Sequence, residues 1–355
     1  MPGPVGRPTI KDVAALAGVS KGMVSLALRG APGPSAQTAA RVLRAAEELG
    51  YRADRAASSL ALRRTRLLGV AMNVRNAYHA ELVEELVSAA GETGYEVVLA
   101  AVTRTRGERA AVETLLDSRC EALLLLGPGS SAAELAELDA RTPVVVLGRR
   151  ARAGSAPGRG PDVVRASDEV GMRLVVEHLA ALGHRDLLHV GGGPGDIAED
   201  RRAGVEAAAA ARGLRVRTVQ AGFDEEAGVV AARRALGEGW APTAVVAAND
   251  RVAVGFLDVL NREGVTVPGD VSLTGYDDSP LARLGHVRLT SVSQDPAEQA
   301  RCAVRLAVGR LDGPGDEGET GGGGAVDVVL EPRLVVRGTT GGPGAGLACQ
   351  NDRTN

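Results

Sequence analysis

Residues 9–28 read TIKDVAALAGVSKGMVSLAL and predict two short helices joined by a turn. Thr9 is a favourable N-cap, and Asp12 follows it at the capping-box position. Apolar residues then recur at helical spacing as far as Gly18, which can adopt the positive φ at which many helices end. Ser20 is the N-cap of a second apolar helix. This helix–turn–helix pattern is one whose second helix can enter the major groove of DNA.

A third helix is expected from its N-cap Ser35 through Leu49, with Gly50 ending it. The three helices of residues 9–50 can together bury a small core. Two helices joined by a glycine turn occur in many proteins, so the motif alone leaves DNA binding as one interpretation among others.

The charge of the chain is unevenly distributed. Residues 1–66 contain eleven Arg or Lys and four Asp or Glu, whereas the remainder contains thirty basic and forty acidic residues. A basic head on an acidic body favours a nucleic-acid partner for the head alone. The alternative is a disordered basic tail, and the helical pattern argues against it.

The composition is that of a soluble globular protein, with 45% hydrophobic and 24% charged residues among 355. No apolar run reaches the ~18–20 residues of a membrane span, and the first residues do not form a secretory signal. The cysteines, Cys120, Cys302 and Cys349, are odd in number and far apart, so neither disulfides nor a zinc site is expected. We therefore expect a cytoplasmic protein with no metal and no membrane partner.

Residues 51–65 form a short basic linker that can become helical. Small residues precede Leu60 there, and small residues let two such helices pack closely. An apolar side chain in that position can wedge between base steps in the minor groove.

These features together resemble the LacI/GalR family of transcriptional regulators. The resemblance is carried by TIKDVAALAGVS at 9–20, by VS at 24–25 and by RAASSL at 55–60, and it extends over about residues 9–340. It implies a homodimer that binds a palindromic operator in double-stranded DNA. It also implies a hinge helix that folds on binding and inserts Leu60 at the operator centre.

The resemblance also indicates which head residues contact DNA. Lys21 is the expected base donor, because Gly22 has no side chain and Leu26 stands where the family commonly has arginine. The departures at Gly22 and Leu26 predict an operator that differs from the family standard. For Leu26 a core position is the alternative. Phosphate contacts are expected from Ser20, Ser25, Arg29 and Ser35. The full set expected at the DNA is Ser20, Lys21, Gly22, Ser25, Leu26, Arg29, Ser35, Arg55 and Leu60.

From residue 66 onward, short β-like runs alternate with helical stretches. This order predicts an α/β fold in which parallel sheets are covered by helices. About ten such units fit two doubly wound lobes better than one sheet. Ligands of such folds bind beyond the carboxyl ends of the strands, so two facing lobes offer a cleft that can close on a small molecule. The resemblance makes this body similar to periplasmic binding proteins.

The expected domain organisation follows from these patterns. The segments are a disordered tail at 1–8, the DNA-binding head at 9–50, the hinge at 51–65, the two-lobed body at 66–338 and a disordered tail at 339–355. Within the body, lobe 1 is expected at 66–164 and 293–324, and lobe 2 at 165–292 and 325–338. Gly-rich stretches at 154–161 and 311–324 are expected to be a loop and a flexible insertion.

Several places in the body look enzymatic but have a simpler interpretation. The run GGGPG at 191–195 fails the dinucleotide and P-loop spacings, which favours a tight turn. Asp277 and Asp278 are adjacent on an extended segment, where side chains diverge. His184 is expected to be structural. No catalytic residue and no cofactor is therefore predicted.

The resemblance instead implies an effector site. Arg201 is the expected bidentate clamp on ligand oxygens, Asn249 both donates and accepts, and Asp277 accepts from paired hydroxyls. The full expected set is Asn73, Tyr78, Arg201, Phe223, Asn249, Asp277 and Gln294. Phe223 offers an apolar face for a sugar ring, so a sugar is the expected effector, with a purine or another metabolite as the alternative.

The sequence thus predicts a dimeric repressor whose operator affinity is coupled to a small ligand, acting as inducer or corepressor. Two other classes remain alternatives: a sugar-binding protein that delivers its ligand to a transporter, and an α/β sugar-metabolising enzyme. The DNA-binding head disfavours the first, and the absence of catalytic spacing disfavours the second.

Overall fold

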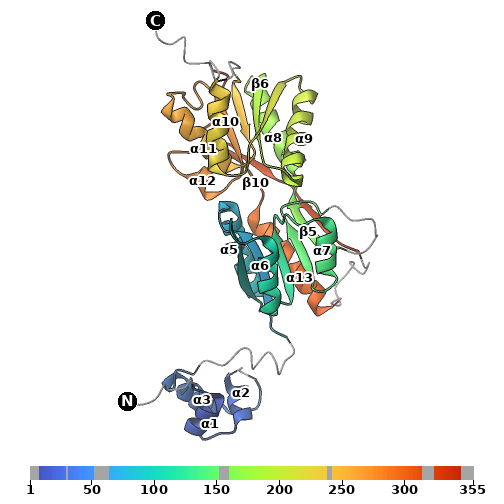
Figure 1. Ribbon diagram of the computed structural model, residues 1–355. Helices are drawn as coiled ribbons and strands as arrows, with labels where there is room; N and C mark the ends of the chain where they lie inside the picture. The colour runs from blue at the N-terminus through green and yellow to red at the C-terminus, as the bar shows by residue number, and fades with distance from the viewer. Residues whose placement is uncertain are drawn as a thin grey trace. The chain divides into compact units, whose positions relative to one another are not determined.

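The computed structural model describes residues 8–28, 31–51, 64–151, 160–237, 242–313 and 324–344. The chain divides into two compact units, Met1–Thr65 and Arg66–Asn355 (Figure 1). Among the described residues, no helix combines the length and the apolar character that crossing a membrane requires.

The described residues of the first unit form three helices, α1 (Ile10–Ala17), α2 (Lys21–Leu28) and α3 (Ala36–Glu48). The carboxylate of Asp12 accepts from the backbone N–H and the hydroxyl of Thr9, both at 2.7 Å. Ser20 Oγ accepts from the Met23 N–H, and Ser35 Oγ accepts from the Thr38 N–H. The predicted N-caps are therefore confirmed.

Each of these helices contributes to one small core. Val13, Val24 and Val42, one from each helix, are fully buried. Gly18 has φ 62°, the left-handed conformation expected of it at the end of α1. The three-helix head predicted from the apolar spacing is confirmed.

In the second unit, the residues that the structure describes form two six-stranded sheets. The first has the order β11-β5-β4-β3-β1-β2 and is parallel throughout. Its strands are β1 (Leu67–Asn73), β2 (Glu96–Val102), β3 (Ala122–Leu126), β4 (Val144–Leu147), β5 (Asp162–Ala166) and β11 (Asp327–Leu330). One face packs on α5 (Ala77–Glu92) and α13 (Pro296–Asp312), the other on α6 (Glu108–Asp117) and α7 (Ala132–Asp139).

The second sheet has the order β12-β10-β9-β8-β6-β7, and β12 pairs antiparallel with β10, while the other described pairs are parallel. Its strands are β6 (Asp186–Gly191), β7 (Arg215–Gln220), β8 (Ala244–Ala247), β9 (Ser272–Asp277), β10 (Thr290–Ser293) and β12 (Arg333–Val335). The pair α8 (Asp168–Ala181) and α9 (Asp196–Ala211) covers one face, and α10 (Glu225–Gly237) and α11 (Asp250–Arg262) cover the other. The short helix α12 (Pro280–Arg283) follows β9. The α/β fold with a helical head is thus as predicted.

One lobe boundary differs from the expectation. Residues 325–338 were expected in lobe 2, yet β11 pairs with β5 of the first sheet, with Asp327 opposite Val163. Arg165 Nη2 lies 2.9 Å from Asp327 Oδ2, so an ion pair joins the two strands. Within this range, β12 is the strand that joins the second sheet. The prediction was wrong for β11 because a short edge strand carries no sequence pattern that identifies its neighbour.

Two other segment predictions are corrected. Residues 339–344, expected in a disordered tail, pack on the second sheet: the Thr339 hydroxyl donates to the Leu273 carbonyl at 2.7 Å and accepts from the Thr290 N–H at 2.9 Å. The insertion expected to begin at 311 begins after α13, which continues to Asp312. The other residues of that insertion and of the tail, and most of the 154–161 loop, lie outside the described residues.

The close packing of α10 on α11 gives a test of the fold. A Cβ at Gly228 would lie 2.1 Å from the Val252 carbonyl oxygen, a backbone atom that cannot rotate away. We therefore expect Gly228→Ala to lower the free energy of unfolding by about 2 kcal/mol or more through overpacking. Gly91→Ala is the matched helical control, because no heavy atom lies within 4 Å of its Cβ. Urea unfolding of both variants should separate them, and equal stabilities would contradict the packing described here.

Candidate functional site

A cavity of about 640 Å³ lies between the two sheets of the Arg66–Asn355 unit. Its walls are segments that follow the carboxyl ends of strands or begin helices, as in other open α/β sheets. The seven residues expected at the effector all line it: Asn73, Tyr78, Arg201, Phe223, Asn249, Asp277 and Gln294. Residues more than 200 positions apart in the sequence therefore share one cavity.

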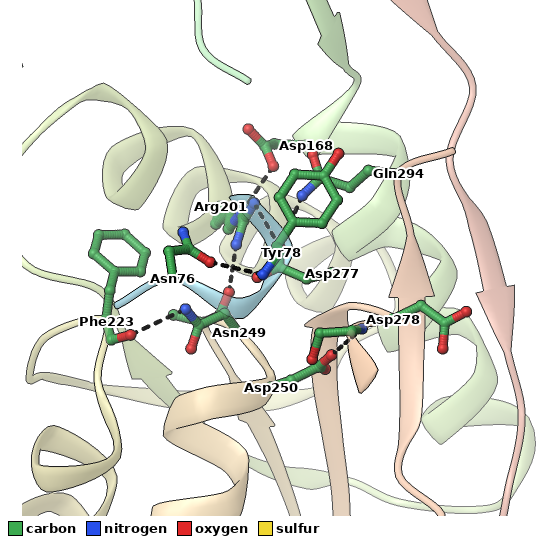
Figure 2. Close-up of polar contacts among 12 residues, drawn as sticks. Asn76, Tyr78, Asp168, Arg201, Phe223, Asn249, Asp250, Asp277, Asp278 and Gln294 are labelled. Carbon is green, nitrogen blue, oxygen red and sulfur yellow. Dashed lines mark hydrogen bonds and ion pairs between the residues drawn. The ribbon is translucent and has the colours of Figure 1, made fainter. Parts of the chain in front are cut away.

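The guanidinium of Arg201, on α9, is held on several sides (Figure 2). Its Nε donates to Asp168 Oδ1 at 2.9 Å and its Nη1 to the Ala248 carbonyl at 2.6 Å. Its Nη2 lies 3.8 Å from Asp277 Oδ1, and its Cζ lies 3.8 Å from the centroid of the Tyr276 ring. Only 4% of the residue is exposed, so water does not compete for these contacts.

The charges of this cluster depend on one another. Burial opposes the charged form of Arg201, but the carboxylates of Asp168 and Asp277 outweigh it and raise the pKa of the guanidinium. Burial raises the pKa of Asp277 to about 6, although Arg201 and the hydrogen bond from Gln294 oppose that rise. Asp277 is therefore ionised at neutral pH and becomes protonated under mildly acidic conditions.

The adjacent carboxylates of Asp277 and Asp278 diverge, as predicted. Asp277 Oδ1 accepts from Gln294 Nε2 at 2.8 Å at the cavity wall. Asp278 Oδ1 lies 2.6 Å from Arg337 Nη2, and Asp278 is not among the residues that line the cavity. Figure 2 shows the Asp278 side chain apart from the cluster that Asp277 forms with Arg201 and Gln294. They do not form a shared acid/base or metal pair.

Asn249, expected to donate to and accept from a ligand, lines the cavity and also makes two internal hydrogen bonds. Its Oδ1 accepts from the Val252 N–H at 3.0 Å and caps α11, and its Nδ2 donates to the Phe223 carbonyl at 3.1 Å (Figure 2). Asn249 thus positions the Phe223 backbone and keeps one amide hydrogen and one oxygen lone pair for a ligand.

The glycine run at 191–195 has a packing role beside Phe223. A Cβ at Gly192 would lie 2.1 Å from Phe223 Cζ, so the ring rests directly on the glycine backbone. Next to it, a Cβ at Gly193 would meet nothing closer than the Gly222 Cα at 4.0 Å. The run is thus a turn that accommodates an aromatic ring, in agreement with its failure to match a phosphate-binding motif.

The first lobe contributes a polar wall at the start of α5. Asn76 Oδ1 accepts from the Tyr78 N–H at 3.0 Å and so fixes this helix terminus. Tyr78 is 5% exposed, and its hydroxyl has no hydrogen-bond partner among the described residues. Burial and the nearby Asp277 charge raise its pKa, so the phenol keeps its proton.

His79 also lines the cavity and was missed by the sequence interpretation. Its Nδ1 accepts from the Asn73 N–H at 3.3 Å. Burial lowers the pKa of the ring to about 4, so the imidazole is neutral at pH 7. Because Nδ1 accepts, the hydrogen of the neutral ring is on Nε2.

Other residues of the site were missed because their partners are distant in sequence. Asp168 was not among the expected site residues, although it begins α8 just after β5. Arg149 follows β4, and its Nη1 lies 2.9 Å from Asp196 Oδ2 at the start of α9. The sequence signal that could have identified Asp168 and Arg149 is their position just after a strand, where ligands of such sheets bind.

Ion pairs also join the two lobes on both sides of the cavity. Arg150 Nε lies 3.1 Å from Asp200 Oδ2, and Arg283 Nη2 of α12 lies 2.5 Å from Glu81 Oε1 of α5. These pairs hold the lobes in the arrangement seen here.

His184 is structural, as expected. Its fully buried ring is hydrogen-bonded to Thr243 Oγ1 at 2.9 Å and lies 2.9 Å from the Gly341 carbonyl oxygen. In the described part of the chain, no group of three His, Cys, Asp or Glu side chains could hold a metal ion.

In the head, Lys21 and Gly22 are exposed at the start of α2. Ser20 and Ser35 use their oxygens as helix caps, and Ser35 Oγ also lies 2.9 Å from Thr38 Oγ1, where either hydroxyl can be the donor. Leu26 and Ser25 are half-buried, and Leu26 lies beside Gly33 rather than in the core cluster of the three helices. Arg29, Arg55 and Leu60 lie outside the described residues.

Comparison with known proteins agrees with this architecture. Residues 9–54 match the family model of bacterial regulatory proteins of the lacI family, and residues 176–340 match a periplasmic binding protein-like domain. The HTH-type transcriptional regulator GalR of Escherichia coli (strain K12) is 33% identical over 310 residues, which cover 86% of this chain and 89% of that protein. The chain belongs to the LacI family of bacterial regulatory proteins.

Solved structures of other regulators are also similar to this LacI-family regulator. The lac repressor dimer bound to operator and the anti-inducer ONPF is similar with a TM-score of 0.78 and 28% identity, over 94% of this chain and 99% of that one. A complex of the transcriptional regulator CelR with cellobiose gives a TM-score of 0.66 and 30% identity, over 94% and 100%. The family resemblance is confirmed, and these relatives are regulators of transcription rather than enzymes.

The contact of Phe223 with Gly192 can be tested directly. The protein contains two phenylalanines, Phe223 and the fully buried Phe256, so fluorine-labelled phenylalanine gives two resonances. We expect Gly192→Ala to displace the ring and shift the Phe223 resonance, whereas the matched variant Gly193→Ala leaves it in place. Identical spectra for the two variants would show that the ring does not rest on Gly192.

Proposed function

We propose that this LacI-family regulator is a dimeric repressor that binds a palindromic operator and is controlled by a sugar bound in the cavity. The observation that carries the proposal is the convergence of seven residues, implied by family resemblance, on one cavity between two lobes. A ligand there contacts both lobes at once and so favours one lobe arrangement over another. An inducer and a corepressor differ in which arrangement they favour.

The head supports the DNA-binding part of this proposal. The exposed start of α2 presents Lys21, and the capping serines at 20 and 35 offer hydroxyl donors of the kind that hold phosphates. The lac repressor structure shows a relative of this chain as a dimer on its operator. By analogy, α2 is the helix that reads the major groove.

Exposed apolar side chains support a dimer. Val87 on α5 and Leu99 on the edge strand β2 are 50% and 51% exposed, and Val230 on α10 is 58% exposed. Large apolar side chains that gather on a surface mark protein interaction sites. Pairing of two copies through the flanks of both lobes would cover them.

The cavity supports a sugar. Sugars combine hydroxyl groups with apolar ring faces, and the cavity offers Asp277 and Tyr78 for the former and Phe223 for the latter. Its relative CelR forms a complex with cellobiose. A sugar is therefore the effector class that fits both the lining and the relatives.

Selection of random duplex DNA on the purified full chain, at near-physiological salt, tests the operator proposal. We expect an inverted repeat with a central pyrimidine–purine step. Lys21→Ala should relax the preference at one position of each half-site, because a base donor is lost. The chain has only one other lysine, Lys11 on α1, and Lys11→Ala should leave the selected sequence unchanged. Binding without any enriched sequence, lost steeply as salt rises, would mean that the head contacts phosphates alone.

The effector proposal is tested by two neighbouring, nearly isosteric variants. Asp277→Asn removes the carboxylate at the cavity and should abolish the response of operator binding to sugars while leaving operator affinity unchanged. Asp278→Asn alters the adjacent carboxylate, which pairs with Arg337 away from the cavity, and should retain the response. The readout is displacement of fluorescent operator by a panel of neutral mono- and disaccharides. A full response from Asp277→Asn would remove this residue from the site.

A further inference from the structure

The short helix α12 lies between the two lobes and outside the cavity. It follows β9, whose last residue, Asp277, lines the cavity, and it packs against α11 of the second lobe and α5 of the first. In the first lobe, α5 carries the cavity residues Tyr78 and His79 in its first turn. In each lobe, the chain therefore runs directly from the cavity wall into this contact.

Hydrogen bonds fix α12 to the second lobe at its N-cap, Ser279. The Ser279 N–H donates to Asp250 Oδ2 at 2.7 Å, and the Ser291 hydroxyl donates to Asp250 Oδ1 at 2.6 Å. Asp250 is fully buried, and a Cβ at Gly275 would lie 2.2 Å from its Oδ1, so the carboxylate is closely packed against β9. We therefore expect α12 to move together with the second lobe.

Arg283 of α12 reaches the first lobe. Its Nε donates to the Asp278 carbonyl at 3.1 Å, and its Nη2 lies 2.5 Å from that carbonyl oxygen and 2.5 Å from Glu81 Oε1 on α5. The two bonds to the Asp278 carbonyl orient the guanidinium toward Glu81. Little side-chain freedom is then lost when the ion pair forms.

The carboxylate of Glu81 depends on this contact. Its side chain is 18% exposed, and its second oxygen, Oε2, is buried without a hydrogen-bond partner among the described residues. A carboxylate with little access to water is unfavourable unless a cation pairs with it, and Arg283 supplies that cation. Separation of α5 from α12 would remove the partner of Glu81. The ion pair therefore favours the lobe arrangement seen here.

We infer that Arg283 and Glu81 are positioning residues that set the equilibrium between this lobe arrangement and one in which α5 and α12 are apart. Neither residue lines the cavity. The inference rests on the proposed control of operator binding by a cavity ligand and names a pair that determines how strongly the two ligands affect each other. A change in this equilibrium alters the affinity of each ligand that prefers one arrangement.

Replacement of Arg283 tests the inference through two affinities of the full chain. The probes are a fluorescent duplex of the selected operator and whichever of glucose, galactose and cellobiose changes its binding. We expect Arg283→Gln to change at least one of the two affinities about three- to fivefold, the effect of a partly exposed ion pair. Arg283→Glu should change it further in the same direction. The double variant Arg283→Glu/Glu81→Arg restores the pair with reversed charges and should return the affinity toward that of the wild type.

Arg109→Gln is the matched control for this test. Arg109 pairs with Glu113 within α6, and its side chain is 93% exposed, so both affinities should stay unchanged. If sugar and operator are coupled in the wild type and Arg283→Gln changes neither affinity, the inference is wrong. It is also wrong if the double variant shows no recovery. A change of oligomeric state in Arg283→Gln, measured by sedimentation, would overturn it as well, because the pair would then act between copies of the chain.

The ligand-free chain provides a test that needs neither sugar nor operator. Tyr78 is buried on α5 and lies near the charges of Asp277 and Arg201 in the second lobe. The protein contains four tyrosines, so fluorotyrosine gives four resonances, and Tyr78→Phe identifies the one of interest. We expect Arg283→Gln to shift or broaden the Tyr78 resonance and to leave that of Tyr95, buried in the first lobe, unchanged. The double charge reversal should restore it.

An unchanged Tyr78 resonance in Arg283→Gln would contradict the inference. The spectra also separate it from the proposed function. If the wild type binds no sugar while the Tyr78 resonance responds to Arg283→Gln and recovers in the double variant, the sugar effector fails. The role of the pair in setting the lobe arrangement then stands.

Discussion

The buried guanidinium of Arg201 is the interaction on which the rest of the site depends. Its partners come from the start of α8, from the residue after β8 and from the end of β9. A buried charge is strongly unfavourable unless it is paired, so these three segments must meet when the second lobe folds. This wall of the cavity therefore forms when the lobe folds, and the polar groups of the wall are oriented before any ligand binds.

In the function proposed above, a small molecule acts through the position of this cavity between the two lobes. The cavity has walls from both lobes, and ion pairs such as Arg149–Asp196 and Arg283–Glu81 join the lobes around it. A ligand bound between rigid walls changes the relative stability of lobe arrangements more than it changes either lobe. If operator binding also prefers one arrangement, the two ligands are coupled through that preference.

The sequence was informative wherever function follows from local rules. The caps at Thr9, Ser20 and Ser35 and the alternation of strands and helices are short-range patterns, and family resemblance located Arg201 and Asp277. Pairings between distant residues could not be read from it. Three features depend on segments that meet only in the folded chain. They are the pairing partner of β11, the packing of residues 339–344 on the second sheet and the internal hydrogen bonds of Asn249. His79 was missed for the same reason, since its role depends on the Asn73 N–H that it accepts from.

The central claim, that one cavity ligand and one operator are linked through the lobes, is tested most directly by measuring the coupling in both directions. Operator affinity would be measured with and without saturating sugar, and sugar affinity with and without saturating operator. We expect the two affinity ratios to be equal, because the coupling free energy belongs to the pair of ligands. A sugar that binds the cavity and leaves operator affinity unchanged would contradict it.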